Sequence, residues 1–105
     1  MFLVKNATGY SFVSGFGDKT SRNFHHRLLM ADDNDETFPG YIAGGPNFQM
    51  QDAGSLKKHG AAYPDTIAAK AYIDHKGSYA SNEVCINWNA PLVYVTAYLN
   101  NHYND

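Results

Sequence analysis

Two carboxylates nine residues apart, Asp74 and Glu83, are the side chains whose types and spacing best suit acid–base chemistry. A general acid must keep its proton near neutral pH, which requires burial or a neighbouring carboxylate. The apolar Val84 and Ile86 after Glu83 favour its burial, and Asp74 supplies the neighbouring charge. These neighbours make Glu83 a candidate proton donor. The alternative is a glutamate at the surface or at a helix entry, where the helix dipole favours a carboxylate.

The adjacent histidines His25 and His26 raise the alternative of a metal site. Their spacing does not readily let both bind one ion, and no cysteine or glutamate-rich partner completes a tetrahedral set. We therefore expect neither a metal nor a cofactor. The acidic stretch 32–36 is predicted to be a solvated loop. Calcium binding is its alternative, but no EF-hand spacing follows.

The motif Gly44-Gly45-Pro46-Asn47 is rich in glycine, as phosphate-binding loops are. However, no Lys-Ser or Lys-Thr pair follows it, and Pro46 removes a backbone donor. The motif therefore favours a tight turn that shapes a cleft over a phosphate site.

One helix near the end of the chain is the clearest element available to position these residues. Asn89 suits an N-cap and Pro91 the first turn, and apolar residues then recur at helical spacing until about residue 100. Alternating apolar residues before it predict an extended entry over residues 83–88.

The rest of the chain is predicted to be mostly loop. Short extended segments are expected over residues 10–14 and 41–43, and one or two helical turns over residues 67–73. Long loops are expected over residues 15–27 and 49–65. Loops beyond about 12–15 residues are uncommon in compact domains unless they are functional. The chain is therefore predicted to be the loop-rich functional surface of a larger protein or assembly.

The composition fits a single polar, aromatic domain. Leu, Ile, Val and Phe make up about a fifth of the 105 residues, while aromatics reach 14% with eight tyrosines. Tyr, Asn, Gly and His are the lining expected where a protein meets sugars. A net charge of -2 argues against nucleic acid, and no apolar run approaches the length of a membrane span. The single cysteine excludes an internal disulfide.

Two stretches carry polar residues at fixed positions in a recognisable order. The first reads Ser11-Phe12-Val13-Ser14-Gly15-Phe16-Gly17-Asp18-Lys19 and, four residues later, Phe24-His25-His26-Arg27. The second reads Tyr72-Ile73-Asp74, then Tyr79, then Glu83, then Asn87-Trp88-Asn89-Ala90-Pro91-Leu92-Val93. They resemble the two signature regions of glycoside hydrolase family 9, the cellulase and endoglucanase family. The Gly-Gly-Pro-Asn motif between them resembles a loop that the family carries in the same order.

The resemblance implies a mainly α fold with long loops, as the C-terminal portion of an (α/α)6 barrel. Residues 1–105 would then be a C-terminal fragment of the catalytic domain, roughly its last quarter and incomplete on its own. The reaction implied is hydrolysis of β-1,4-glucosidic bonds in cellulose-type polysaccharides by an inverting acid/base mechanism.

The resemblance also implies roles for single residues. Glu83 matches the general acid, and Asp74 the second active-site carboxylate, which supports the charge and geometry of the acid. A purely structural carboxylate is the alternative for Asp74. His25 matches the active-site histidine and Arg27 its partner, and both would hold sugar hydroxyls. The remaining substrate-binding candidates are Tyr79, Trp88 and His26.

The catalytic base of the family lies in an Asp-Ala-Gly-Asp motif far upstream, which this chain lacks. Asp52-Ala53-Gly54 resembles that motif superficially, but Ser55 replaces the second aspartate. Phe24 also replaces the Pro or aliphatic residue that usually precedes the histidine. We therefore expect the chain to supply the acid and not the base. It would depend on the missing N-terminal part of the barrel or on a second copy of the chain.

Two alternatives to a hydrolase segment stay open. One is a non-catalytic carbohydrate-binding remnant that uses the same aromatic and basic residues as a sugar platform, and the other is a truncated product. The partner expected is a β-glucan polysaccharide or oligosaccharide, with no nucleic acid and no membrane. Secretion is implied by the resemblance alone.

Overall fold

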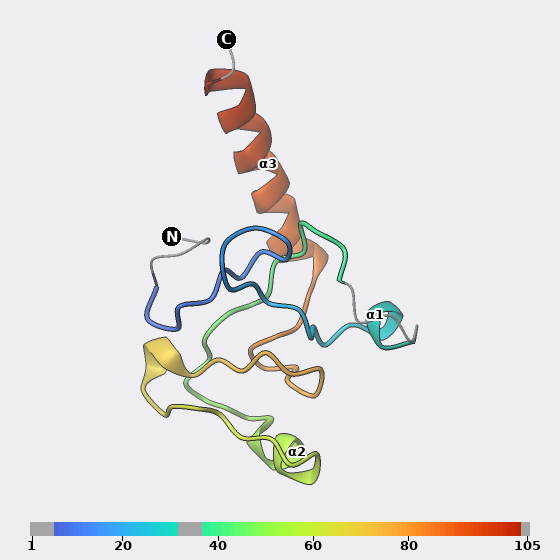
Figure 1. Cartoon of the computed structure of the whole chain (residues 1–105), viewed down its shortest axis with the longest axis vertical. Helices are drawn as coiled ribbons and strands as arrows, with labels where there is room; N and C mark the ends of the chain where they lie inside the picture. Colours follow the sequence, from blue (N-terminus) through green and yellow to red (C-terminus); the bar gives the residue numbers. More distant parts are fainter. Residues whose placement is uncertain (1–5, 32–36, 104–105) are drawn as a thin grey trace.

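The computed structural model describes residues 6–31 and 37–103, so the acidic stretch 32–36 lies outside the described residues. The regular elements are α1 (Arg27–Ala31), α2 (Ala53–Lys58), the 3₁₀ turn η1 (Ala68–Lys70) and α3 (Ile86–Tyr103) (Figure 1). No β-strand occurs within the two described ranges, where only isolated backbone bridges are found. The prediction of helices joined by long loops is confirmed.

Helix α3 extends away from the rest of the chain and sets the longest dimension of a molecule measuring 51 × 33 × 24 Å (Figure 1). None of its residues is buried, and Ile86 and Tyr94 are 84% and 74% exposed. Most helical stability in proteins comes from packing of an apolar face, and a solitary helix is marginal in water. Within the described chain, α3 therefore lacks the packing that ordinarily stabilises a helix of its length.

The predicted start of this helix is wrong. The helix begins at Ile86 rather than after an N-cap at Asn89, Pro91 lies inside it, and it ends at Tyr103 rather than near residue 100. The carbonyl of Cys85 already accepts the backbone N–H of Asn89 at 3.2 Å, so helical hydrogen bonding starts one turn earlier than expected. Residues 83–88 were predicted to be extended, but the last three of them belong to the helix.

The side chain of Asn89 makes tertiary contacts instead of capping the helix. Its Oδ1 accepts the backbone N–H of Ile42 at 3.2 Å, and its Nδ2 donates to the carbonyl of Cys85 at 2.8 Å. The first turns of α3 are thereby fixed to the segment that precedes the Gly44-Gly45 turn.

The predicted loop over residues 49–65 is interrupted by α2. Leu56 in this helix is fully buried and anchors it, while Lys57 and Lys58 in its last turn oppose the negative end of the helix dipole. The helical turns predicted for residues 67–73 are reduced to η1 alone. Both elements are too short to impose a helical period on the sequence, which explains why α2 was not predicted.

Three isolated bridges hold the loops together in place of a sheet. They pair Ser11 with Thr20, Val13 with Ile42, and His25 with Glu83. The extended segments predicted for residues 10–14 and 41–43 lie side by side, because the bridge between Val13 and Ile42 joins them. Distant parts of the chain converge on one region without forming a regular ladder.

The core is small and centred on Tyr72. This residue packs in a cluster with the buried Phe24 and Ala43, and the rings of Tyr10 and Phe12 meet its ring edge-on at 5.2 and 4.9 Å. Many of the other buried side chains are polar. The stability of the chain therefore depends on buried hydrogen bonds as well as on apolar packing.

We expect Tyr72→Phe to lower the free energy of unfolding by about 1–3 kcal/mol. The Tyr72 hydroxyl is hydrogen-bonded to Ser21 and donates to Asn82 Oδ1 at 2.6 Å, and both partners are buried. Removing the hydroxyl leaves Asn82 Oδ1 without its donor and Ser21 with only the carbonyl of Ser11 as a partner. Urea unfolding followed by circular dichroism measures the change. Tyr94→Phe, on the exposed surface of α3, is the control and should change the free energy by less than about 0.5 kcal/mol.

The same residue makes stability depend on alkaline pH. Burial raises the pKa of Tyr72 above its ordinary value of 10.0, and the charge of Asp74 adds to the shift. Above pH 10 the unfolded chain loses this proton while the folded chain retains it, so the free energy of unfolding falls as pH rises. The Tyr72→Phe variant should show a smaller fall than the wild type, and an equal fall in both would contradict the assignment.

Candidate active site

The segment carrying Glu83 lies between two others. The backbone carbonyls of residues 81, 82 and 83 accept the N–H groups of Gly45, His25 and Gly44 at 2.9, 2.9 and 3.1 Å. The carbonyls of residues 81 and 83 thus face the glycine turn, and the carbonyl of residue 82 faces the His25 segment. The His25 segment therefore lies on one side of Glu83 and the Gly44-Gly45 turn on the other, so the first signature, the glycine motif and the second signature meet here.

The side chain of Glu83 is exposed, so the prediction that its apolar neighbours bury it is wrong for this chain. Val84 is partly buried against the core, but Ile86 is at the exposed start of α3. Burial of the Glu83 carboxylate would have to come from protein outside the described residues.

The carboxylate of Asp74 is directed to backbone and amide donors. Its Oδ1 accepts the backbone N–H groups of Arg22 and Asn23 at 3.0 and 2.8 Å and the Nδ2 of Asn82 at 3.1 Å. Its Oδ2 accepts the side-chain amide of Asn23 at 3.3 Å. Asn82 directly precedes Glu83, and residues 22–23 lead into the His25 segment. Asp74 thus fixes the two segments whose pairing places the acid beside the histidine.

His25 and Tyr79 form one aromatic pair of the site. The Nδ1 of His25 lies 2.8 Å from the carbonyl oxygen of Lys76. Because a carbonyl only accepts, Nδ1 carries a proton and Nε2 is left to bond with another group. The rings of His25 and Tyr79 meet at 6.2 Å, and the Tyr79 hydroxyl donates to the carbonyl of Gln51 at 3.2 Å. Tyr79 remains 44% exposed, which leaves part of its ring available.

Trp88 lies on the other side of the Glu83 segment, against the glycine turn. It belongs to the first turn of α3, and its indole ring packs directly on Gly44. The side chain is 39% exposed, so part of the ring faces solvent. Tyr79 and Trp88 are therefore associated with opposite neighbours of the acid.

Arg27 and His26 are placed less closely around the acid. Arg27 is the first residue of α1 and is exposed. The ring of His26 packs on Tyr41 at 5.7 Å, and its buried Nδ1 has no hydrogen-bond partner within residues 6–31 and 37–103. No contact in the described chain joins either side chain to Glu83.

Asp52 is a residue whose importance sequence reasoning missed. It is fully buried, and its oxygens accept the hydroxyls of Tyr63 and Ser78, both at 2.7 Å, and the N–H of Ala80 at 2.9 Å. These bonds fix the turn that presents Tyr79. The resemblance of Asp52 to the upstream base motif drew attention to its sequence context, but no local pattern signals its burial.

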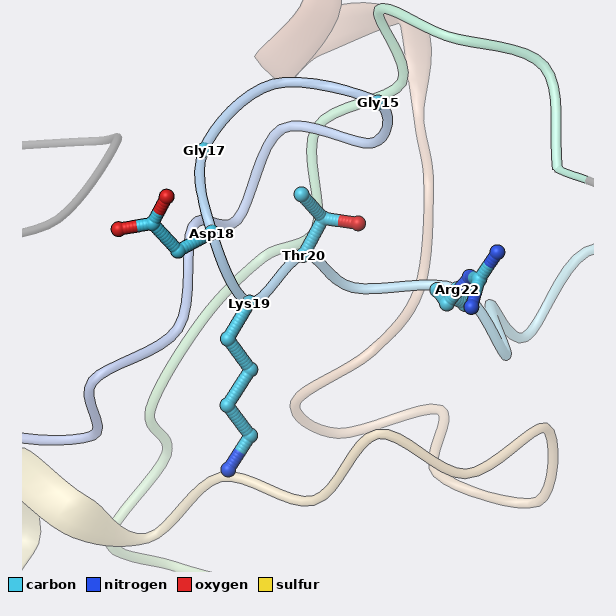
Figure 2. A pocket seen from close by; sticks show the side chains of 6 residues that line it. All are labelled: Gly15, Gly17, Asp18, Lys19, Thr20 and Arg22. Atoms are coloured by element: carbon cyan, nitrogen blue, oxygen red, sulfur yellow. The ribbon is translucent and has the colours of Figure 1, made fainter.

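A hollow lies apart from these residues, along the loop that runs from Gly15 to Arg22 (Figure 2). It measures about 410 Å³ and includes Asp18 and Lys19, which Figure 2 shows pointing in different directions. Lys19 places its ammonium 4.1 Å from the ring centre of Tyr10. None of the predicted site residues lines this hollow.

Metal ligands are not gathered anywhere in the described ranges. No group of three or more His, Cys, Asp or Glu side chains suited to an ion is found among residues 6–31 and 37–103. In the same ranges no helix has the length and apolar character needed to cross a bilayer.

The meeting of three motifs around Glu83 has a counterpart in known proteins. The sequence profile of Glycosyl hydrolase family 9 matches residues 2–96. The chain belongs to this family. The backbone of the chain matches part of the backbone in solved structures of family 9 enzymes, which are (α/α)6 barrels. A mutant thermostable endoglucanase from Alicyclobacillus acidocaldarius matches 90% of the chain with 42% identity and a TM-score of 0.73.

Relatives in family 9 are much longer than this chain. A xyloglucan-specific endo-β-1,4-glucanase of Bacteroides ovatus is 47% identical over 87% of the chain, which corresponds to 14% of that enzyme. A cellulose 1,4-β-cellobiosidase of Acetivibrio thermocellus is 39% identical over 92% of the chain and 11% of its own length. The Alicyclobacillus structure is covered over 17% of its length. The chain therefore corresponds to a small part of each family 9 enzyme that it matches.

Proposed function

We propose that this chain supplies the general acid of a β-1,4-glucan hydrolase that inverts anomeric configuration. The observation that carries the proposal is the position of Glu83, exposed between the His25 segment and the Gly44 turn. An exposed carboxylate bordered by two partly exposed aromatic side chains suits a sugar chain that lies across it. Glu83 would protonate the glycosidic oxygen as the bond breaks.

The other site residues have supporting roles in this proposal. Asp74 holds the acid and the histidine in place through Asn82 and residues 22–23. His25 bonds a sugar hydroxyl through Nε2, and Arg27 and His26 bind further hydroxyls of the substrate. Two aromatic rings stack on sugar faces on either side of the acid; they belong to Tyr79 and Trp88.

The catalytic base is proposed to come from protein outside residues 1–105. An inverting enzyme places its acid and base about 6.5–9.5 Å apart so that a water molecule fits between them. Asp52 does not meet this need, because it is buried and its oxygens already accept three hydrogen bonds. The upstream part of a family 9 barrel, or a second copy of the chain, would supply the base.

The same missing protein is proposed to cover α3. No residue of this helix is buried, although Val93, Val95 and Leu99 are apolar. In an (α/α)6 barrel, neighbouring helices would pack on this surface and bury the Glu83 carboxylate. Because the cellulases of the family are typically secreted, we extend the proposal to a secreted enzyme.

We expect the isolated chain to show little or no hydrolysis of cello-oligosaccharides, since one half of the acid/base pair is absent. We also expect gel filtration to give an apparent mass above 11.6 kDa, because exposed apolar surface promotes association. Clear turnover by a monomer, abolished by Glu83→Gln, would contradict this expectation.

A carbohydrate-binding remnant without activity is the second candidate, and the exposure of Tyr79 and Trp88 favours it. Retention on cellulose without turnover, even when the upstream part of a family 9 barrel is supplied, would favour this candidate over the hydrolase. Failure of the chain to unfold cooperatively would instead favour a truncated product.

A further inference from the structure

Gly44 and Gly45 are glycines for different reasons. Gly45 has a φ of +91°, a left-handed conformation that side chains disfavour. The φ of Gly44 lies outside that region, so this angle does not itself require a glycine. What Gly44 lacks is space, because a Cβ there would lie 2.8 Å from Cη2 and 2.9 Å from Cζ3 of Trp88. The edge of the indole ring occupies the place of a side chain at this position.

The contact between Gly44 and Trp88 is tied to the acid by backbone hydrogen bonds. The N–H of Gly44 donates to the carbonyl of Glu83 at 3.1 Å. Two residues before the glycine, the N–H of Ile42 donates to Asn89, the neighbour of Trp88. The glycine segment is thus fixed both to the acid and to the start of α3. These bonds hold position 44 close to the start of α3, which carries Trp88.

We propose that Gly44 is a positioning residue for Trp88. In this proposal the absence of a side chain at position 44 lets the edge of the indole ring approach the backbone beside Glu83. The ring is then placed where it stacks on a sugar ring next to the bond that is cleaved. The stacking part rests on the proposed function, whereas the seating of the ring does not. A methyl group at position 44 would force the rigid ring to tilt or rise, because carbon atoms pack at about 3.5–4.0 Å.

The full chain offers a direct probe, since Trp88 is its only tryptophan. The variants are Gly44→Ala and, as a matched control, Gly54→Ala. Gly54 lies in α2, is exposed, has no left-handed φ, and has no atom within 4 Å of an added Cβ. We expect Gly44→Ala to change the emission maximum and the acrylamide quenching of Trp88, and Gly54→Ala to leave both unchanged. Unchanged emission and quenching in Gly44→Ala would overturn the proposal.

Titration with cellohexaose tests the stacking part. We expect the sugar to protect Trp88 from quenching in the wild type and in Gly54→Ala. In Gly44→Ala the affinity for cellohexaose should fall by about three- to tenfold, which corresponds to the loss of one aromatic stacking contact. Equal affinities in all three chains would overturn the stacking part. A chain that binds no cellohexaose in any form would count against the proposed function, while the emission change would still decide whether Gly44 seats the ring.

A rescue experiment guards against a variant that simply unfolds. Trp88→Ala removes the atoms that a Cβ at position 44 would meet. Gly44→Ala should therefore lower the urea midpoint of the wild type but not that of the Trp88→Ala chain, as followed by circular dichroism. An equal loss in both backgrounds would mean that the glycine serves the backbone alone, and would overturn the proposal.

Discussion

Glu83→Gln is expected to lower kcat on cellohexaose by about 10²–10⁴-fold, the usual contribution of a general acid. The measurement requires a complete barrel, so this chain would replace the matched segment of the Acetivibrio thermocellus cellulose 1,4-β-cellobiosidase, which is 39% identical to it. Glutamine keeps the size and the backbone bonds of Glu83, including the one from Gly44. It cannot give a proton to the departing oxygen. KM should change much less than kcat, because binding of the substrate is retained.

The choice of leaving group separates proton donation from positioning. In a dinitrophenyl cellobioside the leaving group is dinitrophenolate, which departs without protonation. Glu83→Gln should therefore lose far less activity on this substrate than on cellohexaose. Asp74→Asn is the matched control, since Asp74 acts through Asn82 and residues 22–23. Its loss should be similar on both substrates. If Glu83→Gln lost equal activity on both, Glu83 would not be the general acid.

Asp52→Ala should have the largest effect on stability, a loss of about 3–5 kcal/mol in the free energy of unfolding. The substitution leaves the hydroxyls of Tyr63 and Ser78 and the N–H of Ala80 without their acceptor. Domains are ordinarily stable by only about 5–15 kcal/mol, so this loss is a large fraction of the total. Urea unfolding of the full chain measures the change.

Two further variants define the origin of this loss. Asp52→Asn keeps the size and one carbonyl oxygen, and we expect it to recover part of the stability. Asp18→Ala, at an exposed aspartate on the Gly15–Arg22 loop, should change the free energy by less than about 0.5 kcal/mol. A loss in Asp52→Ala no larger than that in Asp18→Ala would show that the buried network contributes little.

The sequence predicted the parts of the site that depend on motif order. Motifs that are distant along the chain were expected in one active site, and the structure brings His25, Gly44 and Glu83 onto neighbouring segments. The final helix was also foreseen, because apolar residues recur at helical spacing over several turns. The roles of the site residues remain predictions.

Other features depended on contacts that no local pattern records. Asn89 has the residue type of an N-cap, but its amide is used to bind Ile42, and the helix begins earlier. Leu56 anchors α2 because its side chain is buried. The helix is too short for its sequence pattern to predict this burial. Glu83 was expected to be buried because apolar residues follow it, yet its side chain is exposed in the described chain. Tertiary context overrides local preference in each of these cases.

The alternating carbonyls of residues 81–83 restrict how homologous chains can diverge. One extra residue inserted before Glu83 would exchange the carbonyls that face His25 with those that face Gly44, and would turn the carboxylate to the opposite face. At the exposed Pro64 and Thr66 an insertion would cost little more than loop entropy. Length variation should therefore accumulate between α2 and η1, while the spacing from Ser81 to Glu83 stays constant.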